Sequence, residues 1–360
     1  GVQTCALPIW GTSVYLVDRV VPMLPEVLSN GICSLNAHED RYAMTCMMEI
    51  DDSGTVVNYR IRPSIIHVGR RCSYKEVYKA LEENIIPHDL QDFMPMLHDL
   101  AEISKILNRM RRRRGALDFD FPEYKVLLDH DGTPLRIVKR DRTMAERLIE
   151  ECMLIANETV AEHFTRLKLP FIYRIHEDPK AEKVQKFIDY ASSFGIQIYG
   201  TASEMSQEAL QEIMRKVEGE PYADVLSMML LRSMQQARYS EHNHGHYGLA
   251  AEYYTHFTSP IRRYPDLMVH RMVREYGKSQ EMAEHFEQVL PDIASQSSSR
   301  ERRAIDAERE VEAMKKAEYM EDFVGEEYDA VVSSVVKFGL FVELPNTVEG
   351  LIHITNLPEF

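Results

Sequence analysis

Hairpin patterns and helix patterns alternate along the first half of the chain, and this alternation limits the fold more than any other feature of the sequence. Residues 41–68 alternate in polarity on both sides of an Asp-Ser-Gly turn, which predicts two paired strands. Residues 90–114 then read as a long helix, and a second hairpin over 124–141 precedes another helix over 145–164. Locally paired strands between long helices predict an α+β fold.

Capping boxes support two of the predicted helix starts. Ser73 with Glu76, and Thr143 with Glu146, have the spacing at which a hydroxyl and a carboxylate cap each other's backbone N–H groups. Residues 180–318 are mainly helical in pattern and end in a charged helix. From Val324 the pattern changes to short alternating strands, which predicts the start of a small β-barrel.

Composition limits the cellular setting and the partners. No window of eighteen apolar residues occurs, which argues against a membrane span, and no signal segment opens the chain. Five cysteines without a close pair favour a reducing, cytoplasmic setting. The net charge of −15 counts against a polyanionic partner, but binding is local, and residues 109–114 form a strongly basic run. That run is equally typical of a helix C-terminus capped by Gly115.

Two adjacent arginines lie at a predicted helix start. Arg262 and Arg263 stand between two prolines and directly before an apolar helical run. Pro265 and Asp266 fit the first turn of that helix, since proline and acidic residues both suit helix starts. Cations at the positive end of a helix are unfavourable unless an anion lies between them. We therefore expect an anion to bind here.

The residues before the arginine pair fit a phosphate. Pro260 favours an extended Ser259, so Thr258 and Ser259 can direct hydroxyl groups toward an anion that Arg262 binds. The alternative is a structural ion pair with one of the chain's 57 acidic residues. The local sequence supports the phosphate site and the structural ion pair about equally.

Three further groups could take part in chemistry. Glu146, Glu150 and Asn157 share a helix face and could position a ribose or a water, although a solvated stripe explains the spacing equally simply. The histidines of residues 242–246, HNHGH, favour a polar loop over a metal site. Aromatic residues that could stack on bases, or simply pack in a core, are Tyr15, Tyr74, Phe119, Tyr253 and Tyr254.

Residues 245–271, GHYGLAAEYYTHFTSPIRRYPDLMVHR, closely resemble the signature of the ribonuclease II/R exoribonucleases, the RNB-domain family. The segments 11–36, 111–123, 145–164 and 170–179 resemble its ribonuclease R branch in the expected order. The resemblance implies an RNB domain over residues 11–320, with a mixed β-sheet surrounded by helices. Residues 321–360 resemble the beginning of an S1-type RNA-binding domain, an OB-fold.

The resemblance also implies an activity and roles for single residues. The family hydrolyses RNA processively from the 3′ end, releases nucleoside 5′-monophosphates and uses Mg²⁺. The expected partners are single-stranded RNA 3′ ends, with structured RNA left open, and we expect a cytoplasmic monomer. Arg262 would stabilise the transition state, Tyr74 would contact the last nucleotide, and Glu150 would hold the terminal ribose. The further RNA-binding candidates are Tyr15, Phe119, Tyr254, Thr258, Ser259 and Arg263.

One departure from the family pattern concerns the metal. The aspartate cluster that binds Mg²⁺ in the family lies upstream of the segment that begins at Gly11, and residues 1–10, GVQTCALPIW, contain no acid. We therefore expect a non-matching leader over 1–10, no metal site and an inactive piece of the enzyme. The alternative is an RNA-binding or regulatory relative that does not cut RNA. A zinc hydrolase built on the histidine loop is a third, disfavoured hypothesis.

Overall fold

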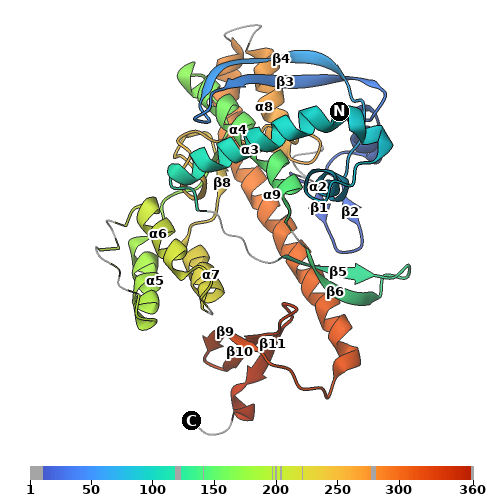
Figure 1. Cartoon of the computed structure of the whole chain (residues 1–360). Coiled ribbons are helices and arrows are strands. Elements are labelled where there is room, and N and C mark those ends of the chain that lie inside the picture. Colours follow the sequence, from blue (N-terminus) through green and yellow to red (C-terminus); the bar gives the residue numbers. More distant parts are fainter. Residues whose placement is uncertain are drawn as a thin grey trace. The chain divides into compact units, whose positions relative to one another are not determined.

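The computed structural model describes residues 11–117, 123–140, 142–196, 198, 201–202, 205–220, 222–276 and 281–357. It confirms the α+β class (Figure 1). The described strands form small antiparallel sheets of two or three strands, where one mixed sheet was expected. The chain divides into two compact units, which we describe separately: unit 1 comprises residues 1–12, 22–120 and 142–300, and unit 2 comprises residues 13–21, 121–141 and 301–360.

The α-helices are α2 (Tyr74–Glu82), α3 (Met94–Arg113), α4 (Met144–Arg166), α5 (Ala181–Ser193), α6 (Gln207–Val217), α7 (Ala223–Ser233), α8 (Tyr264–Glu275) and α9 (Glu281–Met320). Short 3-10 helices cover His88–Phe93, Tyr247–Leu249, Glu321–Phe323 and Ile354–Asn356, and a π-helix covers Val27–Ile32. The strands are β1 (Val14–Tyr15), β2 (Val20–Val21), β3 (Asp40–Ile50), β4 (Val56–His67), β5 (Glu123–Leu128), β6 (Pro134–Arg140), β7 (Tyr173–Ile175), β8 (Arg238–Ser240), β9 (Val331–Val336), β10 (Gly339–Glu343) and β11 (Glu349–His353). None of the described helices combines the length and the apolar character needed to cross a membrane.

The predicted hairpins and helix starts are confirmed. Strands β3 and β4 pair antiparallel, and Gly54 in their turn has a φ of 91°, a conformation that favours glycine. Ser73 caps α2 and Thr143 caps α4, each with a complete capping box. At the end of α3, Gly115 has a φ of 99° and closes the helix, as expected for the basic run.

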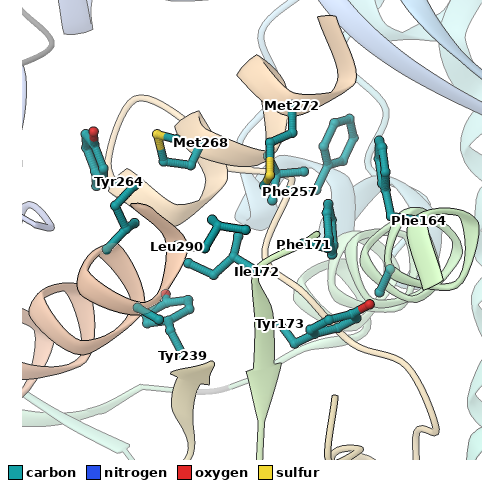
Figure 2. Packing of buried hydrophobic residues seen from close by; sticks show 14 of the residues in the cluster. Phe164, Phe171, Ile172, Tyr173, Tyr239, Phe257, Tyr264, Met268, Met272 and Leu290 are labelled. Carbon is teal, nitrogen blue, oxygen red and sulfur yellow. The ribbon is translucent and has the colours of Figure 1, made fainter. Parts of the chain in front are cut away.

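The main core of unit 1 fixes the start of α8. Phe164 of α4 stacks on Phe171 at a centroid distance of 4.6 Å, next to Phe257 (Figure 2). Met268 and Met272 of α8 are buried in the same cluster. Full burial of one such side chain stabilises a fold by roughly 1.5–3 kcal/mol. The loop that precedes α8 is therefore anchored at both ends by core residues.

Two further clusters complete the cores of unit 1. Residues of α2 and α3 pack on the first turn of α4, where Val77, Leu97 and Ala145 are buried together. Helices α5, α6 and α7 bury a separate cluster that includes Phe187, Leu210 and Leu226. Of the five cysteines, Cys33, Cys46, Cys72 and Cys152 lie in the described residues and are free.

Unit 2 contains the strands expected of the C-terminal β-region. Strand β10 pairs antiparallel with both β9 and β11, so the sheet order is β11-β10-β9. Gly339 begins β10, and a Cβ atom there would lie 2.2 Å from the carbonyl oxygen of Ile352. The close approach of these two strands therefore requires glycine at this position.

Candidate functional site

The segment from Phe257 to Arg263 forms a loop that leads into α8. Tyr264, Pro265 and Asp266 make up the first turn of the helix, which confirms the predicted start. The backbone carbonyl of Ser259 accepts the N–H groups of Arg262 and Arg263, at 3.2 and 3.1 Å, so the loop turns tightly at Pro260. Both arginine side chains thus begin at the N-terminus of α8.

The two arginines have different environments. Arg263 donates from Nη2 to Oδ1 of Asp266 at 2.7 Å, and the Asp266 side chain is fully buried at 0% exposure. This is the structural ion pair that was the alternative interpretation of the arginine pair. The pair counts against an RNA-binding role for Arg263, which stays a prediction, because the charge of Arg263 is neutralised inside the protein.

Arg262 keeps its guanidinium available. Its side chain is partly exposed, and across the described ranges it has no hydrogen-bond or ion-pair partner. Only its backbone is held: its carbonyl accepts the hydroxyl of Thr12 at 3.1 Å. In addition, Oγ1 of Thr258 is buried without a partner among the described residues. A cation and an unpaired hydroxyl in one tight loop, at a helix start, are the components of an anion site.

Asn157 supports this loop from α4. Its Oδ1 accepts the N–H of Phe257 at 2.9 Å, and its Nδ2 donates to the hydroxyl of Tyr254 at 3.1 Å. Asn157 is 2% exposed and Tyr254 is 5% exposed. Burial raises the pKa of Tyr254 to about 12. Burial of Tyr254 counts against a role in stacking on bases, and that role stays a prediction. Asn157 is buried too, so it does not belong to a solvated helix face.

The remaining candidates lie on other elements. Tyr74 is the first residue of α2 and is 46% exposed, so its ring is available to a ligand. Glu150 lies at the surface of α4 and is paired with Arg142, while Glu146 is engaged in the capping box of Thr143. Helix α4 thus carries both Glu150 and Asn157, about 10 Å apart along its axis at 1.5 Å per residue.

Two candidates lie elsewhere. In unit 2, Tyr15 is 47% exposed, and its backbone N–H donates to the carboxylate of Glu308 at 2.6 Å. Phe119 lies outside the described residues. The exposed rings of Tyr15 and Tyr74 remain compatible with stacking on bases.

The basic run at the end of α3 is partly structural. Arg111 makes a buried bidentate ion pair with Glu151, to which Asn108 also donates at 2.7 Å. Arg114 makes a second bidentate pair with Glu158, both bonds being 2.8 Å long. These pairs dock α3 on α4. The helix C-terminus interpretation is confirmed for this run, and the two arginines are not free to bind RNA.

The histidine loop does not form a metal site within the described part of the chain. His246 is partly buried, with its ring 5.1 Å from that of His176. Burial, followed by the charges of His176 and Arg174, lowers the pKa of His246 to about 3. The potential metal ligands that do lie together are Asp129, His130 and Asp131, within 4.8 Å of one another.

This acidic turn qualifies the expectation that the chain contains no metal site. It is the exposed turn between β5 and β6 in unit 2. One carboxylate oxygen of Asp129 accepts the N–H groups of Asp131 and Thr133, both at 2.9 Å. That arrangement is common in turns without any metal.

Fold and site together define a class: an α+β protein with a candidate anion site in the loop before a helix, followed by a small antiparallel β-region. Comparison with known families narrows the class. The sequence profile of the RNB domain matches residues 9–279, and that of the S1 RNA binding domain matches residues 321–359. The chain belongs to the RNB domain family.

Individual relatives agree with this assignment. The chain is 55% identical over 351 residues to ribonuclease R 1 of Lactococcus lactis, covering 96% of this chain and 43% of the relative. It is 45% identical to ribonuclease R of Thermotoga maritima, covering 97% and 50%. The chain thus spans about half the length of the curated relatives it matches.

Solved structures share the fold over nearly the whole chain. RNase R of Mycoplasma genitalium, in complex with ribose-methylated single-stranded RNA, matches with a TM-score of 0.95 at 28% identity, covering 99% of this chain and 57% of that one. The same enzyme in complex with double-stranded RNA matches with a TM-score of 0.90, also at 28% identity, covering 96% and 62%. The resemblance to the ribonuclease R branch is confirmed.

Proposed function

We propose that this chain is part of a 3′-to-5′ exoribonuclease of the ribonuclease R type, which degrades RNA processively to nucleoside 5′-monophosphates. The observation that carries the proposal is the loop before α8, where Arg262 and the Thr258 hydroxyl lack partners among the described residues. An RNA phosphate supplies the missing anion. Family membership supports RNA as the substrate.

Each proposed contact is the one that the resemblance to the family implies for its residue. Arg262 offsets the charge that develops on the phosphate during hydrolysis, assisted by the hydroxyl groups of Thr258 and Ser259. The exposed ring of Tyr74 lies against the last base, and Glu150 holds the terminal ribose after exchanging its bond to Arg142 for one to the 2′-hydroxyl. Phe119 stacks on the terminal bases, and Tyr15 holds the strand where it enters the channel that leads to the site.

We propose Mg²⁺ as the cofactor of the complete enzyme, because the enzymes of the RNB family are metal-dependent. Bound by carboxylates, it supplies an activated water for hydrolysis. The Asp129–Asp131 turn does not fit this role, because it is exposed and its first carboxylate already accepts two backbone N–H groups. We propose that residues 11–360 bind RNA without cutting it unless the family's aspartate cluster is supplied.

The partners and the domain boundaries complete the proposal. Relatives solved with single-stranded and with double-stranded RNA support single-stranded 3′ ends as the main ligand and structured RNA as a further one. We propose a leader over residues 1–10, an RNB domain over 11–320 and an S1-type region over 321–360. We also propose a cytoplasmic monomer, in line with the free cysteines.

The alternative function is an RNA-binding protein that does not cut. A yeast pseudonuclease, Ssd1, shares the fold with a TM-score of 0.66 at 20% identity, covering 95% of this chain and 42% of that one. The RNB fold therefore occurs in a protein described as a pseudonuclease. The same assay separates the two functions.

The experiment uses 5′-labelled single-stranded RNA with Mg²⁺ and two proteins: the chain itself, and an extended form that carries the family's aspartate cluster ahead of Gly11. We expect the chain to bind RNA without shortening it, and the extended form to shorten RNA stepwise from the 3′ end. Binding without shortening by both forms would support the non-cutting alternative. Shortening of RNA by the chain without the extension would show that residues 11–360 build a metal site.

A further inference from the structure

The two adjacent arginines of the loop differ in one respect that the sequence does not explain: one is bound internally and the other is left free. The difference arises at Asp266, which is fully buried on the first turn of α8. Its Oδ1 accepts both the Ser259 N–H and an Arg263 Nη2–H, each at 2.7 Å. A single oxygen thus fixes the loop and neutralises one of its two cations.

We propose that Asp266 is a positioning residue for the Arg262 site. It acts by withdrawing Arg263 from the ligand and by fixing Ser259, so that Arg262 alone meets the phosphate in a fixed position. The proposal deepens the proposed function and rests on it. Asp266 has no contact of its own with the ligand in this mechanism.

The backbone around Thr258 shows how rigidly the loop is held. The N–H of Phe257 donates to Asn157, and its carbonyl accepts Nε2 of His270 at 2.8 Å. His270 follows Asp266 by four residues, so both side chains lie on one face of α8. Three side chains from two helices therefore hold the residues on either side of Thr258, whose own hydroxyl is left unpaired.

The arrangement leaves buried polar atoms unsatisfied. Oδ2 of Asp266 and Nε of Arg263 are buried without partners in the parts of the chain that the structure describes. Unsatisfied atoms of this kind cost stability and are found where function requires them. A carboxylate in this place supplies the charge that pairs with Arg263, whereas asparagine could only accept the Ser259 N–H.

The first experiment separates the two actions of Asp266 in the extended form on single-stranded RNA. Asp266→Asn keeps an acceptor for Ser259 but releases Arg263, so we expect kcat to fall at least tenfold while KM stays the same or decreases. The double variant Arg263→Gln with Asp266→Asn removes both charges and keeps the acceptor, and it should recover kcat to within about threefold of the unchanged protein. Asp292→Asn, an exposed acid on α9, is the matched control.

The outcomes are distinct. The proposal would be overturned if the double variant failed to recover kcat. It would also be overturned if both variants lost kcat only in proportion to a loss of thermal stability, because unfolding alone would then explain the loss. A double-mutant cycle with Arg262→Ala tests the coupling. In the Arg262→Ala background, Asp266→Asn should change kcat by less than twofold, because Asp266 acts through Arg262. Additive losses would show that Asp266 acts on its own.

The second experiment needs no catalysis and uses the chain itself. Hydrogen exchange of the amides of residues 257–263 should be at least tenfold faster in Asp266→Ala, which loses the acceptor, and within threefold of the unchanged chain in the double variant. Unchanged exchange in Asp266→Ala would show that Asp266 does not hold the loop. If the loop responds as expected but the extended form has no nuclease activity, the proposed function fails and the positioning of the loop stands.

Discussion

At the residue scale, chemistry depends on which side chains the fold leaves unpaired. Arg262 is partly exposed and has no partner in the described ranges, whereas its neighbour Arg263 is bound to Asp266. A cation that is already paired gains little from a phosphate, since it must first give up its carboxylate. We therefore expect transition-state stabilisation to depend on the free guanidinium of Arg262.

Replacing Arg262 tests this role directly. In the extended form, Arg262→Ala should lower kcat by about 10²–10³-fold, the cost of losing one donor to a developing charge, while KM changes by less than about threefold. Steady-state kinetics on a labelled oligoribonucleotide would measure both. Arg274→Ala, an exposed arginine in the last turn of the same helix, is the control. Equal losses in kcat and in affinity would contradict a role centred on the transition state.

Two adjacent glutamates of α4 make a second comparison at this scale. Glu151 is buried with Arg111, whereas Glu150 is 40% exposed with Arg142. Glu151→Ala leaves a buried cation unpaired and should lower the free energy of unfolding by about 3–5 kcal/mol. Glu150→Ala should change it by less than about 1 kcal/mol. Urea unfolding, monitored by circular dichroism, would measure both free energies. Similar losses in the two variants would show that Glu151 is no more important to stability than Glu150.

At the element scale, local signals in the sequence were sufficient for hairpins and helix starts. The Asp-Ser-Gly turn and the capping boxes of Ser73 and Thr143 act within four residues, so a single sequence reveals them. The partner of Arg263 was only three residues away, but its burial depends on the core beneath α8. Asn157 meets Phe257 across 100 residues, and no local pattern reports such a contact.

The β-region of unit 2 offers a test at this scale. Gly339→Ala would place a Cβ atom 2.2 Å from the carbonyl oxygen of Ile352, so β10 and β11 could not keep their spacing. We expect the amides of β11 to lose their protection from hydrogen exchange in this variant. Gly350→Ala lies on the same ladder with nothing within 4 Å of the added atom, and it should leave protection unchanged. Protection retained in Gly339→Ala would contradict the pairing.

At the scale of the whole molecule, the net charge of −15 is a poor guide to the partner. Many positive charges are consumed in internal pairs, as with Arg111, Arg114 and Arg263. A free arginine and an unpaired hydroxyl in one loop matter more to an RNA phosphate than the sum over the surface. The sequence motif predicted an anion site in this loop, and the structure shows which of the two arginines is paired internally.

Partly buried histidines make the stability of unit 1 dependent on pH. The pKa of His246 is about 3, lowered first by burial and then by His176 and Arg174, while burial also lowers the pKa of His176 and His270. A histidine whose pKa is depressed on folding takes up its proton in the unfolded chain first. The free energy of unfolding is therefore fully retained above about pH 6.5 and decreases as the pH falls toward 3.

The contribution of His246 can be isolated. Between pH 7 and pH 5 it should account for a loss of about 2 kcal/mol, at 1.36 kcal/mol for each unit below 6.5. His246→Gln should flatten the pH dependence by that amount, because glutamine does not titrate. His242→Gln, in the same loop but with a side chain 76% exposed, should leave the pH dependence unchanged. Urea unfolding at half-unit intervals would decide the matter: parallel curves for the two variants would show that burial of His246 does not control the acid sensitivity of the fold.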